Sequence, residues 1–267
     1  SGAVTAANVS NSPYVLDISN AQGVGLGNYA ITYVSGSLNV NPATLTITAS
    51  NDAKVYGATT TSSNNLAYSN GSVVTTSGYT VTGLANGDLI YGLTLNSNGA
   101  LAASAVGAGS GASGRYTITP SAAVGSPGLN TNYNLVYVDG LMTVTPAALI
   151  ISAINDSRVY GSSTTALNQT YSSNAASTSS GFSVQGLVNG DLINTITLTS
   201  QGAATTAAVG GGSLSGGAYS ILPSAALGSP GLGNNYAITY LPGRMTVTPA
   251  TLVVSVLGSN KAYDGGT

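Results

Sequence analysis

The sequence of 267 residues contains no cysteine, histidine, tryptophan or glutamate. Without histidine, cysteine and glutamate, the chain lacks the usual general bases and activated nucleophiles of enzymes. We therefore expect no enzymatic activity and no cofactor. The lack of cysteine fits an exported protein, in which an unpaired thiol is a hazard, and it is also compatible with the cytosol.

Charge is nearly as scarce, because only 4% of the residues carry a formal charge, against about 25% in ordinary soluble domains. The net charge of −2 creates no field that would attract nucleic acid or an anionic membrane, so neither is an expected partner. No apolar run approaches the roughly 18 residues of a membrane-spanning helix, and membrane insertion is not expected. Apolar residues still make up 43% of the chain, which is enough to bury a core.

What the sequence does contain is a repeat of about 104 residues. Tyr56 recurs as Tyr160 and Tyr263, and the segment LANGDLI at 84–90 recurs as LVNGDLI at 187–193. The segment SAAVGSPGL at 121–129 likewise recurs as SAALGSPGL at 224–232. These matches predict four parts: the end of one module (1–43), two complete modules (44–147 and 148–250) and the start of another (251–267). Both ends fall inside a module, so we expect a fragment of a longer array.

Each module is predicted to be all-β. The segments TLTIT at 44–48, LIIS at 149–152 and TLVVS at 251–255 have the β-branched, half-buried pattern of strands. Modules of about 100 residues with several short strands favour tandem immunoglobulin-like β-sandwiches, with β-grasp-like modules as the alternative. Near its end each module also carries an apparent hairpin, turning at Ser35-Gly36, Asp139-Gly140 and Pro242-Gly243.

The junction between modules predicts a stiff connection. In the run from Leu38 to Ile47, the last strand of one module leads directly into the first strand of the next, with only Asn41-Pro42 between them. Proline fixes φ near −65° and favours an extended residue before it, and no Gly/Ser tether intervenes. Repetition of this step predicts an elongated rod.

The motifs together resemble the YGX-type MBG repeats, and the related YDG repeats, of large bacterial filamentous-haemagglutinin-like surface adhesins. The resemblance rests on the VTPA strand entry at 144–147 and 247–250, the K/R-x-Y-G motif, the G-L-x-N-G-D segment and the NY-x-I/L-x-Y segment. It covers essentially the whole chain, and the third copy, KAYDG at 261–265, is similar to the YDG variety. It implies stalk or filament modules that project a distal binding region from the bacterial cell surface.

Two other functions stay open. The repeats themselves can bind a carbohydrate or a host-cell or matrix protein, or the chain can be a self-associating filament subunit. The sixteen tyrosines bear on the first alternative: exposed tyrosines gathered on one face favour binding, whereas buried ones favour a spacer whose partners are neighbouring modules of the same chain. The glycine-rich runs 106–114 and 209–217 lack the Lys-Ser/Thr ending of a phosphate-binding loop, and we interpret them as mobile loops.

One short motif concentrates the charge: NDAKVYG at 51–57 returns as NDSRVYG at 155–161 and as SNKAYDG at 259–265. An acid, a base and a tyrosine that recur once per module, where the first strand ends, predict a structural seam rather than a catalytic or metal site. We expect the base to form an ion pair with a nearby aspartate, exposed and worth about 0 to 1 kcal/mol, while the tyrosine packs. The candidate seam residues are Asp52, Lys54, Tyr56, Asp88, Asp156, Arg158, Tyr160, Asp191, Lys261 and Tyr263.

Overall fold

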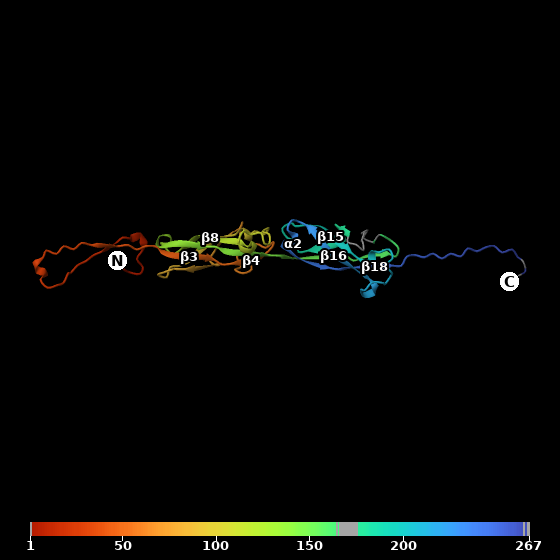
Figure 1. Ribbon diagram of the computed structural model, residues 1–267, viewed down its shortest axis with the longest axis horizontal. Helices are drawn as coiled ribbons and strands as arrows, with labels where there is room; N and C mark the ends of the chain where they lie inside the picture. The colour runs from red at the N-terminus through yellow and green to blue at the C-terminus, as the bar shows by residue number, and fades with distance from the viewer. Residues whose placement is uncertain (1, 164, 166–175, 264, 266–267) are drawn as a thin grey trace. The chain divides into compact units, whose positions relative to one another are not determined.

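The computed structural model describes residues 2–163, 165, 176–263 and 265. The chain divides into two units, the first comprising residues 1–147 with 233–237 and the second comprising residues 148–232 with 238–267. Strands dominate both units, which confirms the all-β prediction (Figure 1). No helix in the described part of the chain is long and apolar enough to cross a membrane.

The first complete module contains two sheets. Their strands are β3 (Ala43–Ala49), β4 (Asp52–Val55), β5 (Ser72–Thr75), β6 (Tyr79–Thr82), β7 (Ile90–Asn96), β8 (Tyr116–Gly125), β9 (Tyr133–Val138) and β10 (Gly140–Thr145). The larger sheet has the order β4-β10-β8-β7-β5, and the smaller one has the order β6-β3-β9. Three short helical turns lie between the strands: η3 (Asn98–Ala100), η4 (Ala112–Gly114) and α1 (Leu129–Asn132).

The second complete module has the same two-sheet plan. Its strands are β11 (Ala147–Ala153), β12 (Asp156–Val159), β13 (Ala176–Thr178), β14 (Phe182–Gln185), β15 (Ile193–Thr199), β16 (Tyr219–Gly228), β17 (Tyr236–Leu241) and β18 (Gly243–Thr248). The sheet orders are β12-β18-β16-β15-β13 and β14-β11-β17. The helical turns are η5 (Gln201–Ala203), η6 (Ser215–Gly217) and α2 (Leu232–Asn235).

The chain before β3 forms a small antiparallel pair, β1 (Tyr14–Leu16) with β2 (Gly36–Leu38). Two 3-10 turns accompany it, η1 (Val9–Asn11) and η2 (Leu26–Asn28). After β18, the described residues 249–263 and 265 belong to no helix or strand.

Both sheets of the first module contribute to one core. The alternation of β3 buries Leu45 and Ile47 completely, as the half-buried strand pattern predicts. Leu93 from β7, Ile118 from β8 and Met142 from β10 belong to the same cluster. The smaller sheet therefore packs through its β3 face against the larger one.

The predicted hairpin at Asp139-Gly140 does not form. Strand β9 pairs with β3 in the smaller sheet, whereas β10 pairs with β4 and β8 in the larger one. Asp139 is thus the single residue between β9 and β10, where the chain passes from the smaller sheet to the larger one. Neither Gly140 nor its counterpart Gly243 has a positive φ, so a type I′ turn is also absent.

The glycine at this crossing between sheets permits a close approach of two backbones. A Cβ atom on Gly140 would lie 2.6 Å from the Ala49 carbonyl oxygen and 2.8 Å from that of Ser50. On Gly243 it would lie 2.7 Å from the carbonyl oxygen of Ala153. The sequence pattern predicts a turn at this glycine. The actual reason for glycine is the neighbouring backbone, which only the sheet pairing reveals.

We predict that Gly243→Ala lowers the free energy of unfolding by about 1 to 3 kcal/mol, because the new methyl group must displace a backbone carbonyl in a packed interior. The matched control is Gly233→Ala, where a Cβ atom would meet nothing within 4 Å. Urea denaturation of both variants checks this expectation. Equal stability of the two would show that the close approach does not constrain the fold.

Candidate functional site

The recurring acid and base lie on β4 and β12 and face inward. Asp52 and Lys54 alternate with outward-facing residues of β4, and their side chains are only 4% and 1% exposed. Asp156 and Arg158 on β12 are 6% and 3% exposed. The expectation of an exposed pair is therefore wrong: the motif places its charge in the interior, because the period of two in a strand carries both side chains to the same face.

Arg158 is held by backbone carbonyl groups. Its Nε donates to the Gly202 carbonyl at 2.5 Å, and its Nη1 donates to the Ser162 carbonyl at 2.8 Å and, less favourably, to that of Val159. Its Nη2 donates to the carbonyl of Ala204. The planar guanidinium thus links the end of β12 to η5, in the way that its several divergent donors allow.

Lys54 occupies the same position in the first module without such partners. In the described part of the chain, its Nζ atom is buried and has no hydrogen-bond partner. Burial lowers the pKa of Lys54, because the interior disfavours the charged amine. One Nζ atom has fewer directions for donation than a guanidinium, which explains why the two modules differ at equivalent positions.

Asp52 fixes a loop. Its Oδ1 atom accepts hydrogen bonds from the backbone N–H groups of Ala53, Ser63 and Asn64, at 2.7, 3.1 and 3.3 Å. Asp156 makes the first of these contacts in the second module, accepting from the N–H of Ser157 at 2.7 Å. The carboxylate therefore satisfies the backbone N–H groups of residues 63 and 64 and holds that loop against β4.

The asparagine that opens the motif was not among the predicted site residues. Asn51 Oδ1 accepts the backbone N–H of Leu141 at 2.8 Å, and Asn155 Oδ1 accepts that of Arg244 at 2.8 Å. Each bond joins the short connection between the first two strands of a module to the start of its last strand. The chain passes from the smaller sheet to the larger one at both of these places. The recurrence of Asn in the motif was the available signal, but its partner lies about 90 residues further along the chain.

The motif's tyrosines differ in environment. Tyr56 is 6% exposed, Tyr160 is 47% exposed and Tyr263 is 99% exposed. The backbone N–H groups of Tyr56 and Tyr160 donate to the carbonyls of Thr145 and Thr248, each at 2.8 Å, and so prolong the β4·β10 and β12·β18 ladders. Lys261 and Tyr263 are exposed and lie outside any strand.

Asp88, in the Asn-Gly-Asp turn, accepts a hydrogen bond from the Tyr133 hydroxyl at 2.8 Å. The same hydroxyl accepts from the backbone N–H of Ala85 at 2.9 Å. Burial raises the pKa of Tyr133, and the Asp88 carboxylate adds to that rise. The turn is thus tied to the start of β9, and nothing in the sequence pattern indicates Tyr133 as the partner of Asp88. Asp191 occupies the equivalent turn of the second module.

The described candidate residues are distributed over separate elements of the module. Asp52 and Lys54 lie on one strand and Asp88 lies in a separate turn, and the carboxylates have the structural contacts given above. Among the described residues, no group of three potential metal ligands comes together. The motif's side chains connect loops, turns and strand ends within a module, which is an architectural role.

We predict that Arg158→Lys lowers the free energy of unfolding by about 2 kcal/mol, because several charge-assisted hydrogen bonds are lost in a buried place. The reciprocal change, Lys54→Arg, is expected to stabilise the first module by about 1 kcal/mol if the guanidinium reaches the equivalent carbonyls. Chemical denaturation measures both changes. If Arg158→Lys leaves the stability unchanged, the carbonyl contacts of Arg158 do not stabilise the module.

Tyr68 provides a prediction about alkaline pH. Its side chain is 7% exposed, its hydroxyl has no hydrogen-bond partner in the described part of the chain, and burial together with the Asp52 charge raises its pKa to about 12. Between pH 10 and 12 the unfolded chain loses this proton while the folded chain keeps it. Stability must therefore fall with rising pH in this window, by about 2 kcal/mol from Tyr68.

The matched variant is Tyr68→Phe, which removes the titrating hydroxyl and breaks no hydrogen bond of the described residues. We expect it to have near-parental stability at pH 7 and a smaller loss between pH 10 and 12, measured by urea denaturation at each pH. An undiminished alkaline loss in the variant would contradict the assignment.

Comparison with known families gives a match in the second module. Residues 149–246 match the family model described as the MBG domain (YGX type). No curated protein and no solved structure matches the chain. The matched range begins within β11 and ends within β18, so it covers both sheets and the NDSRVYG motif of the second module. The segment 149–246 is therefore an MBG domain of the YGX type, the family that the sequence motifs indicate.

Proposed function

We propose that the chain is a stalk or filament segment of a secreted or surface-exposed bacterial adhesin. Its modules hold a distal binding region away from the cell, and their partners are the neighbouring modules of the same chain. The MBG match supports a repeat module of surface proteins, and the sparse charge fits an extracellular structural role. No catalytic step and no cofactor belong to this function.

The observation that carries the proposal is the pairing of the first and last strands of a module. Strand β3 is parallel to β9 over six residue pairs, from Ala43↔Tyr133 to Thr48↔Val138. Strand β4 is parallel to β10 over four more, from Asp52↔Met142 to Val55↔Thr145. The segments 43–55 and 133–145 therefore run side by side in the same direction, and each changes sheets after its first strand.

This arrangement suits a load-bearing module. A force that pulls the start of β3 and the end of β10 apart acts along the strands, in opposite directions on the two paired segments. The interstrand hydrogen bonds then share the load, whereas bonds pulled apart from one end break in succession. Forced unfolding is governed by the unfolding rate. Because many interstrand hydrogen bonds must break together, we expect this geometry to slow unfolding under load.

Contacts between successive repeats support the same role inside the first unit. Asn132, at the end of α1, accepts the backbone N–H of Val9 at 3.0 Å and donates to Asn8 Oδ1 at 2.8 Å. Residues 8 and 9 belong to the preceding repeat by sequence, whereas Asn132 belongs to the complete module. A polar side chain thus joins the two repeats in addition to the covalent Asn-Pro connection.

The proposal keeps a β-sandwich with immunoglobulin-like modules as its architecture. Two sheets over a common core support the sandwich, and no packed helix of β-grasp type occurs among the described residues. The parallel β3·β9 and β4·β10 ladders depart from the purely antiparallel sheets of immunoglobulin domains. These parallel ladders are the feature on which the proposed resistance of the module to pulling depends.

Single-molecule pulling tests the proposal, and the lack of native cysteine allows the attachment points to be chosen freely. With attachment cysteines at Ala43 and Thr145, the paired segments are loaded along their length. With cysteines at Thr59 and Thr145, β4 is peeled from β10 at one end. We expect a markedly higher rupture force for the first pair, and equal forces for the two pairs would overturn the mechanical role.

A further inference from the structure

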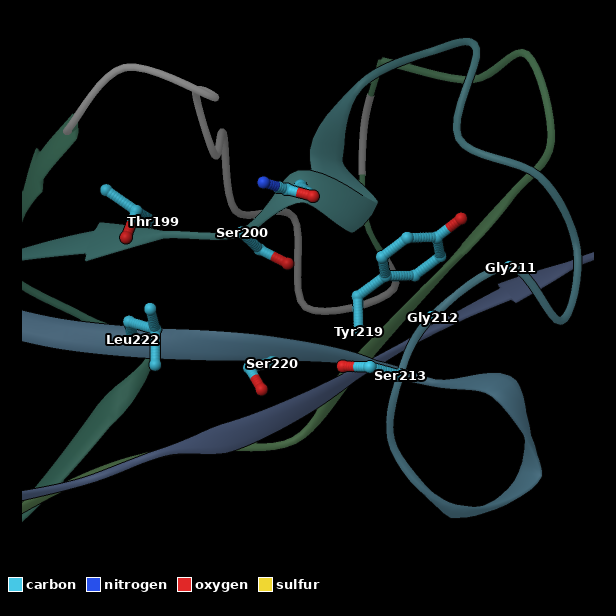
Figure 2. A pocket seen from close by; sticks show the side chains of 9 residues that line it. Thr199, Ser200, Gly211, Gly212, Ser213, Tyr219, Ser220 and Leu222 are labelled. Carbon is cyan, nitrogen blue, oxygen red and sulfur yellow. The ribbon is translucent and has the colours of Figure 1, made fainter.

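A groove lies at one end of β15 and β16 in the second module (Figure 2). Its volume is about 480 Å³, within the range of small-ligand pockets. Its walls are the end of β15, the start of η5, the glycine-rich loop and the first part of β16. The lining residues are Thr199, Ser200, Gln201, Gly211, Gly212, Ser213, Tyr219, Ser220 and Leu222.

The same groove recurs in the first module. There the lining includes Asn96, Ser97, Asn98, Ser110 and Tyr116, which occupy the positions of Thr199, Ser200, Gln201, Ser213 and Tyr219 in the repeat. Its volume is smaller, about 160 Å³. A tyrosine with hydroxyl and amide side chains around it is thus a feature of the module.

The glycine-rich loop is an ordered wall of this groove, whereas the sequence interpretation was a mobile loop. The N–H of Gly212 donates to the Gly217 carbonyl at 2.9 Å, and the Tyr219 hydroxyl donates to the Ala208 carbonyl at 3.0 Å. A Cβ atom on Gly211 would lie 2.5 Å from the Tyr219 hydroxyl oxygen. A Cβ atom on the next residue, Gly212, would lie 2.1 Å from the backbone carbonyl oxygen of Ala218, so the path of the loop requires glycine there.

The groove contains an unused polar group. Ser200 is 4% exposed, and its Oγ atom has no hydrogen-bond partner in the part of the chain that the structure describes. Figure 2 shows its hydroxyl at the wall of the groove, on the side of Tyr219 and Ser220, and the oxygen atom itself is almost completely covered. A buried hydroxyl without a partner costs free energy, so a ligand that enters the groove and uncovers this oxygen would gain a hydrogen bond and remove that cost.

We propose that this groove binds an uncharged sugar unit of a glycan. No lining residue carries a formal charge, so nothing in the lining compensates a phosphate, a sulfate or a carboxylate. Serine, threonine and glutamine side chains donate and accept hydrogen bonds, as sugar hydroxyls require, while Tyr219 and Leu222 offer apolar surface to the C–H face of a sugar ring. This activity goes beyond the stalk role and does not depend on it.

The test is a titration of the isotope-labelled 267-residue chain, followed by NMR, with neutral oligosaccharides of β-linked glucose, α-linked glucose, mannose and galactose. A sialylated oligosaccharide, a sulfated oligosaccharide and a neutral extended peptide are the comparison ligands. We expect at least one neutral sugar to shift the resonances of residues 199–201, 211–213 and 219–222, with a dissociation constant on the order of 1 mM. Smaller shifts are expected at the equivalent groove of the first module.

Two pairs of measurements separate binding from folding. Ser213→Leu fills the groove from an exposed position, whereas Ser215→Leu makes the same change in the same loop outside the lining. The first variant should abolish binding and the second should preserve it. Ser200→Ala should reduce affinity by about tenfold without lowering the melting temperature, because the hydroxyl has no described protein partner.

The proposal is overturned if no neutral sugar shifts these resonances, if only the charged sugars or the peptide do so, or if Ser213→Leu binds as well as Ser215→Leu. None of these outcomes affects the pulling experiment, and a low rupture force would not affect sugar binding.

Discussion

The close contact between two chain segments, 43–55 and 133–145, is the constraint on which the rest of the first module depends. Both segments begin in the smaller sheet and end in the larger one, and they change sheets beside each other. Gly140 allows the backbones to approach there, and Asn51 bonds the two crossing points together. The core follows from this crossing, because it brings the two sheets face to face.

The buried charged side chains of the motif are mostly satisfied by backbone groups. A buried charge is costly unless hydrogen bonds satisfy it, and here backbone groups supply them. Asp52 accepts from three N–H groups, and Arg158 donates to several carbonyls. The Nζ atom of Lys54 has no hydrogen-bond partner in the described part of the chain. At this position the first module therefore lacks the hydrogen bonds that Arg158 makes in the second.

The proposed load-bearing and ligand-binding roles use different parts of the module. The charged motif and the crossing lie where the first and last strands meet, while the groove lies at the glycine-rich loop and the ends of β15 and β16. The lining of the groove can therefore differ between modules, as it does at Gln201 and Asn98, without a change in the paired first and last strands.

The sequence by itself determined the repeat, the all-β class, the inward-facing alternation of strands such as β3 and the MBG motifs, because these are local or periodic patterns. It also singled out Asp52, Lys54 and Tyr56, since they recur. Only the tertiary structure decided that Asp139-Gly140 is a crossing between sheets, that Arg158 is satisfied by carbonyls and that a buried serine without a described hydrogen-bond partner lines a groove. Each of these depends on backbone or side-chain groups brought together from distant parts of the chain, and a local pattern carries no information about such partners.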